Sequence, residues 1–154
     1  MKDTERKLAT ILATVCVSFS KHLEDSEEKP LRILNECRKI IDNKITEYGG
    51  KIFSTAGDSV VAEFASPVQC VKAAIEFQNE IYKRNDPSIT ELKLDWRVGI
   101  HVDDVIVEND NIMGSGVNIS ARLESECEPG GILLSTIVKD QVNKRIDAKI
   151  EIDG

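Results

Sequence analysis

The chain has 154 residues, a formal net charge of −7 and 41% hydrophobic residues. This length and apolar content suit a single α/β domain over residues 1–154 with a core of its own. The acidic balance excludes nucleic acid or an anionic membrane as the main partner, because both reward clustered Lys and Arg. No run approaches the roughly 20 apolar residues of a membrane span, and the charged start lacks the apolar segment of a secretory signal. We therefore expect a cytoplasmic protein.

The cysteines are widely spaced and form no CxxC pair, which argues against a zinc or redox motif. They are Cys16, Cys37, Cys70 and Cys127. Each lies in a segment with an apolar pattern. We interpret all four as reduced core residues.

The first half of the chain begins with a predicted central strand at Leu8–Val17, which is β-branched and almost wholly apolar, as in strands buried on both faces. The charged run Glu24–Lys29 predicts a solvated loop. Apolar residues then recur at helical spacing over Leu31–Tyr48, which predicts a long amphipathic helix ending at Gly49-Gly50.

A hairpin and a second helix follow. The two short strands Lys51–Ser54 and Ser59–Phe64 flank Ala56-Gly57-Asp58, so we expect a tight turn with Asp58 at its tip. The helix begins at Pro67 and ends before Asn85.

The C-terminal half carries two strands joined by a turn at Asp103-Asp104, then a helix, a short strand and the start of another helix. In chain order these elements cover Leu92–Val102, Val105–Val107, Gly114–Cys127, Ile132–Ser135 and Val138–Val142. Lys149–Gly154 stops in the middle of a pattern, so we expect the domain to be truncated at its C-terminus. The element order predicts an α+β fold, a ferredoxin-like mixed sheet with helices packed on one face.

Four stretches together resemble class III adenylate and guanylate cyclases over nearly the whole chain. They are Arg6–Ser20, Thr55–Glu63, Arg97–Val107 and Gly114–Pro129. The run GSGVNISARLESECEPGG after VGIHVDDVIV is a specific signal. The resemblance implies the nucleotide cyclase fold and in-line attack of a ribose 3′-hydroxyl on the α-phosphate of a nucleoside triphosphate. It also implies two Mg²⁺ or Mn²⁺ ions held by two Asp residues, in a site shared between two chains.

The resemblance places one metal-binding carboxylate at Asp58, for which the alternative is a plain turn residue. It identifies Asn118 and Arg122 as the transition-state pair, and their i, i+4 spacing puts both on one helix face. The alternative is a solvated Arg near a cap-like Asn. Phe19 and Ser20 match the loop whose backbone amides cradle the triphosphate, although Phe19 also suits the core.

Four positions depart from the family pattern. Val15 stands where the other metal-binding Asp belongs, and valine cannot bind a metal. Ser18 replaces a glycine in the phosphate loop, where glycine allows positive φ. The purine-selecting Lys and Asp fall on Ser54 and Asn111.

These departures favour a catalytically impaired cyclase homology domain that senses nucleotide and forms a homodimer, or a heterodimer with a homologous cyclase domain. One alternative is an active adenylate or guanylate cyclase, completed in a heterodimer by a partner that supplies both metal-binding Asp residues. Another is a structural interaction domain that binds no nucleotide.

Overall fold

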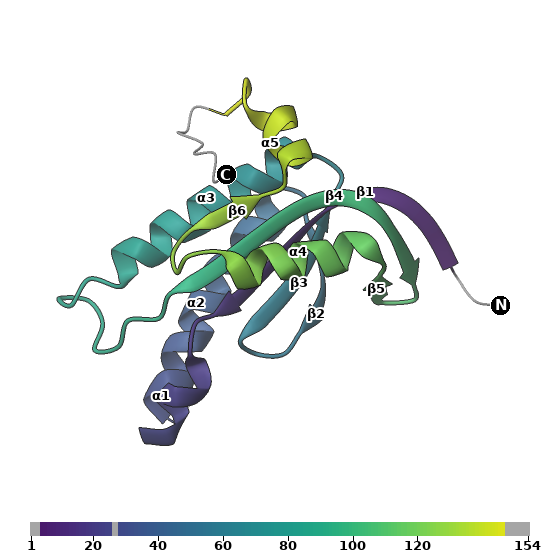
Figure 1. Cartoon of the computed structure of the whole chain (residues 1–154). Helices are drawn as coiled ribbons and strands as arrows, with labels where there is room; N and C mark the ends of the chain where they lie inside the picture. Colours follow the sequence, from purple (N-terminus) through teal and green to yellow (C-terminus); the bar gives the residue numbers. More distant parts are fainter. Residues whose placement is uncertain (1–3, 26–27, 147–154) are drawn as a thin grey trace.

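The strands assemble into one mixed sheet in the computed structural model, which describes residues 4–25 and 28–146 (Figure 1). Over these residues the sheet has six strands in the order β2-β3-β1-β4-β5, with β6 also paired to β4. The β4–β6 pair is parallel and the other pairs are antiparallel. The strands are β1 (Thr4–Cys16), β2 (Lys51–Thr55), β3 (Ser59–Phe64), β4 (Trp96–Glu108), β5 (Asn111–Met113) and β6 (Ile132–Leu134). As predicted, β1 is central.

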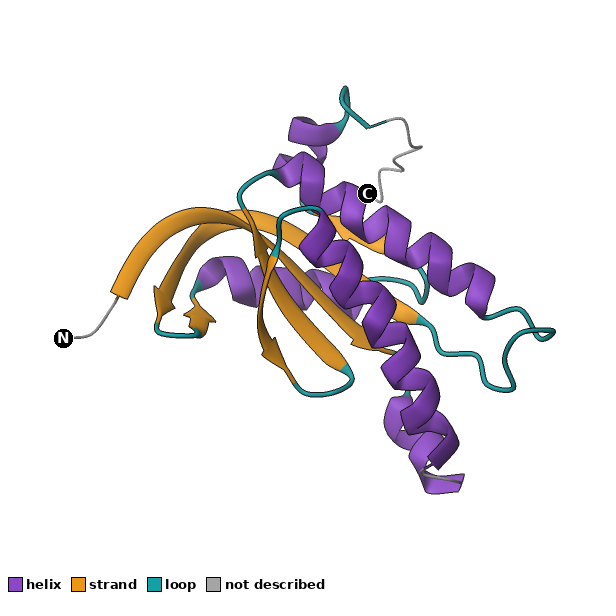
Figure 2. Cartoon of the chain, turned by 180° about the vertical axis from the view of Figure 1, so that it is seen from behind, coloured by secondary structure: helices purple, strands orange, loops and turns teal. Residues whose placement is uncertain are grey.

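Helices lie on both faces of this sheet, with α2 and α3 on one face and α4 on the other (Figure 1, Figure 2). The helices are α1 (Phe19–Asp25), α2 (Glu28–Glu47), α3 (Pro67–Arg84), α4 (Ser115–Glu126) and α5 (Thr136–Val142). The start of α3 follows from its sequence, because the Ser66 side chain accepts a hydrogen bond from the Gln69 amide and Pro67 occupies the first turn.

The two faces of β1 bury different clusters, because successive strand residues point to opposite sides. Leu12 and Cys16 belong to the larger core, together with the buried faces of α2 and α3. Ala9 and Ile11 belong to a smaller cluster, against which Val117 of α4 packs. This double burial explains why the part of β1 from Ala9 to Cys16 is mostly apolar.

The packing of α4 on the sheet depends on a close approach between backbones. A Cβ atom at Gly99 of β4 would overlap the backbone of Ser120 and Glu124. The buried Ser120 hydroxyl donates a 3.0 Å hydrogen bond to the Ile11 carbonyl of β1. Gly99 and Ser120 therefore let α4 lie directly on the two central strands.

Three expectations from the sequence were wrong. The helices do not pack on one face only, because α4 covers the face opposite α2 and α3. The expected loop at Glu24–Lys29 is largely helical: Glu24 lies in α1, while Glu28 and Lys29 begin α2. The expected turn at Asp103-Asp104 lies inside β4, which pairs with β1 from Trp96 to Glu108. The real turn follows at Asn109-Asp110, where Asn109 has a φ of 56°.

Element boundaries also differ in places. Leu8 is 71% exposed, so β1 is not buried on both faces along its whole length. The strand expected from Leu92 begins at Trp96. The helix suggested at Val138–Val142 is present and begins at Thr136. Lys149–Gly154 lies outside the described residues.

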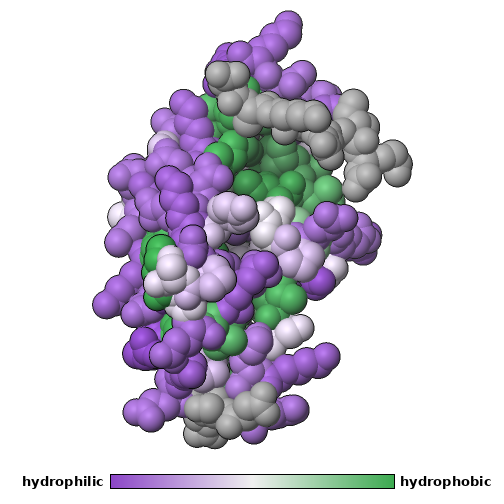
Figure 3. Space-filling model, turned by 90° about the vertical axis from the view of Figure 1, so that its left-hand side faces the viewer, coloured by the Kyte–Doolittle hydropathy of each residue, from purple (hydrophilic) through white to green (hydrophobic). Residues whose placement is uncertain are grey.

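On the side of the molecule seen in Figure 3, hydrophilic side chains dominate, and apolar ones gather in a hollowed area in the upper half.

Candidate functional site

Asp58 lies in the tight turn between β2 and β3, as the sequence predicted. Gly57 takes a left-handed φ of 57°, a conformation that glycine adopts without strain. The Asp58 carbonyl accepts a 2.8 Å hydrogen bond from the Cys16 amide at the end of β1. The Asp58 side chain is only partly buried, so its carboxylate is within reach of solvent and ligands.

Val15 is a neighbour of this turn. It pairs with Ser59 of β3 on one side and with Arg97 of β4 on the other. By the alternation of β1, its side chain is on the same face as Ile11, which is the face that α4 covers. The structure therefore brings the backbones of Val15 and Asp58 together, with a carboxylate at only one of the two positions.

The segment after β1 turns sharply into α1. Ser18 has a left-handed φ of 54°. Phe19 is 7% exposed and packs in the larger core, so its side chain has a structural role. Ser20 is exposed at the start of α1. The first amides of a helix have no intrahelical partner, so the backbone of Phe19 and Ser20 is suited to an anion even though the Phe19 side chain is not.

The two positions expected to select the purine lie on different strands. Ser54 is in β2, in a stretch where the register to β3 shifts by a β-bulge; its side chain lies outside the described part of the structure. Bulges re-aim strand residues and occur next to many active sites. Asn111 is exposed at the start of β5, opposite Glu108.

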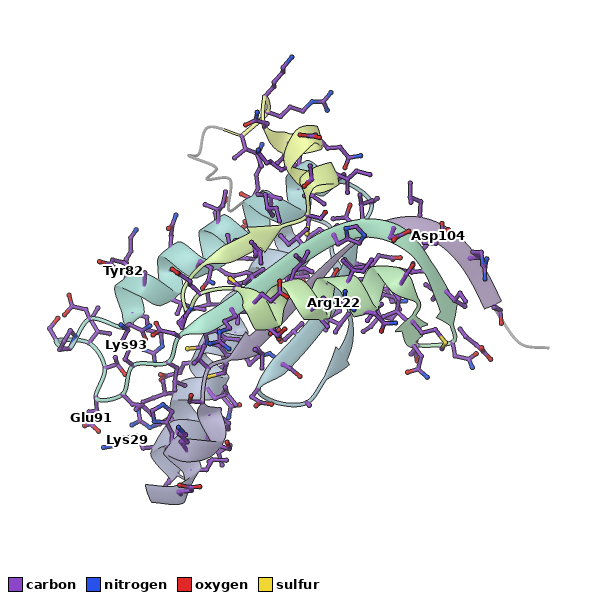
Figure 4. All side chains as sticks on the ribbon, in the orientation of Figure 1. Lys29, Tyr82, Glu91, Lys93, Asp104 and Arg122 are labelled. Atoms are coloured by element: carbon purple, nitrogen blue, oxygen red, sulfur yellow. The ribbon has the colours of Figure 1, made fainter. Side chains whose placement is uncertain are left out.

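Asn118 and Arg122 are both exposed on α4, four residues apart. Figure 4 shows Arg122 on this helix. Within residues 4–25 and 28–146, neither side chain has a hydrogen-bond or ion-pair partner, and no such contact joins either of them to Asp58. Both groups are therefore available to a ligand or to another chain.

The donor set at Asp58 suits one hard cation shared with a phosphate ligand, because Mg²⁺ commonly uses one or two protein carboxylates and completes its shell with phosphate oxygens and water. Across the described residues, no cluster of three or more His, Cys, Asp or Glu side chains could hold a metal ion. With valine at position 15, the site does not fit the pair of metal ions that two Asp residues would hold.

The four cysteines are buried and free, as the sequence predicted. Burial is the main cause that raises the pKa of the Cys16 thiol to about 12, and nearby Cys37, Asp58 and Asp95 raise it further. Burial also raises the pKa of the other three thiols. These thiols are protonated at neutral pH and are poor nucleophiles.

Arg38 is a contributor to this region that sequence reasoning missed. Its Nη1 donates a 2.9 Å hydrogen bond to the Gly57 carbonyl, next to Asp58. The i, i+4 pair that Arg38 makes with Asp42 on the predicted helix was visible in the sequence. The contact with the hairpin depends on how α2 lies against the sheet, which no local pattern reveals.

A separate small hollow lies away from these residues. It is lined by Gln78, Ile81, Tyr82, Asn85, Asp95 and Gly130. None of the predicted site residues lines it, and Figure 4 shows Tyr82 on α3, well apart from Arg122.

The described helices include none that is long and apolar enough to cross a membrane.

Comparison with known proteins gives a consistent result. A family model described as the adenylate and guanylate cyclase catalytic domain matches residues 2–153. Putative adenylate cyclase 3 of Rhizobium meliloti (strain 1021) is 31% identical over 147 residues, which cover 95% of this chain and 25% of that protein. The chain thus spans about a quarter of the length of this curated relative.

Two solved structures share the fold. The adenylate/guanylate cyclase/hydrolase from Silicibacter pomeroyi superposes with a TM-score of 0.87 at 32% identity, over 94% of this chain and 85% of that one. The adenylyl cyclase CyaB from P. aeruginosa gives a TM-score of 0.83 at 24% identity, over 93% of this chain and 84% of that one.

Proposed function

Because the chain belongs to the family of class III adenylate and guanylate cyclase catalytic domains, we propose that it is a nucleotide-binding, dimer-forming member with impaired cyclase activity. The observation that carries this proposal is Val15, which lies on the strand next to the Asp58 turn and offers no ligand where the family has its other metal-binding Asp. The changed residues Ser54 and Asn111 support the same conclusion for purine selection.

Asp58 is the residue that would hold Mg²⁺ or Mn²⁺ together with the triphosphate. A bound ion would neutralise part of the phosphate charge and, in a complete two-metal site, would also activate the attacking hydroxyl. Loss of one preorganised electrostatic group typically lowers a rate by about 10²–10³. We therefore expect binding to survive and turnover to be very slow.

Asn118 and Arg122 act on a nucleotide held mainly by the other chain of a dimer. Their amide and guanidinium groups are suited to a ribose oxygen and a phosphate. Their exposure on α4, without partners among the described residues, supports this shared arrangement. It also keeps open a second candidate function, in which an intact homologous partner supplies both Asp residues and this chain supplies Asn118 and Arg122 to one working site.

The test uses the purified wild-type domain, Asp58→Asn, and a triple variant carrying Val15→Asp, Ser54→Lys and Asn111→Asp. Calorimetry with Mn²⁺ and ATP or GTP should show binding to the wild type with little preference between the purines, because Asn111 can both donate and accept hydrogen bonds. Asp58→Asn should abolish most of this nucleotide binding. Cyclic AMP production should be very low in the wild type and should rise in the triple variant.

The control is Arg122→Ala in the triple variant, which should remove the restored activity. Val15→Asp alone should restore less, because groups that act as a unit are not additive. Robust turnover by the wild-type domain would overturn the impaired-site proposal. Absence of nucleotide binding would favour a structural interaction domain instead.

A further inference from the structure

The tip of the β2–β3 hairpin has almost no packing of its own. Ala56 and Gly57 are exposed, and a Cβ atom added at Gly57 would meet nothing within 4 Å. A turn without side-chain packing keeps its shape through hydrogen bonds, so the direction of the Asp58 carboxylate depends on the partners of the nearby backbone groups.

Two of these partners lie on either side of Asp58. The Cys16 amide of β1 donates to the Asp58 carbonyl at 2.8 Å. Arg38 of α2 donates from Nη1 to the Gly57 carbonyl at 2.9 Å. The Gly57 carbonyl belongs to the same planar peptide group as the Asp58 nitrogen. Arg38 therefore fixes the plane from which the Asp58 side chain departs.

The Arg38 side chain is itself held in place. Its Nε contacts Oδ1 of Asp42 at 3.2 Å, and its Nη2 contacts Oδ2 of the same carboxylate at 3.3 Å. The side chain is only 15% exposed. A guanidinium held by a carboxylate through two parallel contacts keeps a defined orientation, which a lysine in its place would not. The third nitrogen of the same group reaches the hairpin.

We propose that Arg38 is a positioning residue that sets the Asp58 carboxylate for the metal ion of a metal–nucleoside triphosphate, with Asp42 as its anchor on α2. This role rests on the proposed function of Asp58 as metal ligand. It assigns no contact between Arg38 and the nucleotide.

The probe is Mn²⁺ with 3′-deoxy-ATP, which lacks the attacking hydroxyl, and binding is followed by water proton relaxation rather than by turnover. Arg38→Gln should weaken binding roughly tenfold, the range expected for loss of a charged hydrogen bond. Lys39→Gln, which removes the same charge from an exposed position of the same helix, should leave binding unchanged. Equal effects of the two variants would overturn the proposal.

Arg38→Lys separates orientation from charge. It keeps the cation but cannot hold Asp42 and Gly57 together, so it should recover less than half of the loss caused by Arg38→Gln. Full recovery would overturn the orientation argument. A double-mutant cycle adds the second criterion. In an Asp58→Asn background, Arg38→Gln should have no further effect, whereas an undiminished tenfold effect would show that Arg38 does not act through Asp58.

Hydrogen exchange of the Asp58 amide without metal tests the geometry independently. It should be faster in Arg38→Gln than in the wild type or in Lys39→Gln, and unchanged exchange would overturn the positioning role whatever the metal does. Lack of Asp58-dependent Mn²⁺ binding in the wild type would overturn the proposed function. Faster exchange of the Asp58 amide in Arg38→Gln would still show that Arg38 orders the hairpin.

Discussion

Ser18 holds a left-handed backbone conformation in the turn between β1 and α1, with a φ of 54°. The Cβ atom of a residue other than glycine disfavours this region. The sequence pattern had marked this position, because the resembled family has glycine there. The turn keeps its shape with serine, so the fold tolerates the strain.

Ser18→Gly should therefore raise the free energy of unfolding by about 1 kcal/mol, because the backbone strain is relieved. For a domain of this size that corresponds to an increase of about 2–4 °C in Tm, which differential scanning calorimetry would resolve. Ser20→Gly is the matched control: Ser20 is helical and exposed, so glycine there should lower stability. A lower Tm for Ser18→Gly would contradict the strain argument.

The local structure around the candidate site residues could be predicted from sequence, but their contacts could not. Asp58 was placed at a hairpin tip by a Gly-Asp turn between two strand patterns, and the structure has it there. Arg38 lies 19 residues before Gly57, and its hydrogen bond to that carbonyl depends on tertiary packing. For Phe19 the alternative that the sequence left open is confirmed, because its side chain packs in the core.

At the level of elements, β4 shows why local turn signals fail. Asp103-Asp104 is typical of turns, and the Asp103 carboxylate does accept a 2.7 Å hydrogen bond from the Asp104 amide. However, the pair lies opposite Leu8 and Ala9 of β1 in a continuous ladder. The strand pairing outweighs the local preference, as tertiary context commonly does.

The packing of α4 on the sheet also depends on tertiary context, through Gly99 of β4. Gly99→Ala places a methyl group against the backbone of Ser120 and Glu124, and neither can move without displacing the helix. We expect a loss of about 2–3 kcal/mol in the free energy of unfolding, measured by urea denaturation.

Gly130→Ala is the comparison for this effect. Gly130 has a φ of 81°, and a Cβ atom added there would meet nothing within 4 Å. Alanine at this position should therefore lower the free energy of unfolding only by the backbone strain, about 1 kcal/mol. If Gly99→Ala cost no more than Gly130→Ala, the close approach of α4 to β4 would not be required for stability.

For the molecule as a whole, the four buried thiols predict how stability depends on pH. In the unfolded chain they ionise near their usual pKa of 9.0, whereas in the folded state Cys16 ionises only near 12 and the others also have raised pKa values. Above pH 9 the folded state binds more protons than the unfolded state, so the contribution of the thiols to stability is fully present well below pH 9 and is lost as the pH rises.

Urea denaturation between pH 8 and 10 should show a loss of about 1 kcal/mol from Cys16 by pH 10, and the other three thiols should add losses in the same direction. This window lies below the raised pKa of Lys7, which adds a loss in the same direction at higher pH. Cys16→Ala should be less stable than the wild type at pH 8 but should lose less stability on going to pH 10. If the free energy of unfolding of the wild type did not change between pH 8 and 10, the raised pKa values of the buried thiols would be contradicted.

The overall arrangement could be predicted in part. The central position of β1, the hairpin, the mixed sheet and the three main helices follow from period, turn residues and the family resemblance. The distribution of helices over both faces did not follow from the element order, because that order does not specify the face on which each connection crosses. Gly99 and Ser120 allow α4 to pack closely on the face opposite α2 and α3. The sequence did not reveal this, because glycine in a strand can serve several structural purposes.

The surroundings of Val15 also have a consequence for engineering the domain. It is half-buried and, among the described residues, belongs to neither hydrophobic cluster. A carboxylate introduced at this position would therefore displace no side chain of either core cluster. An acidic residue here would meet little packing resistance, whereas Gly99 and Ser120, where α4 meets the sheet, leave no room for a larger side chain.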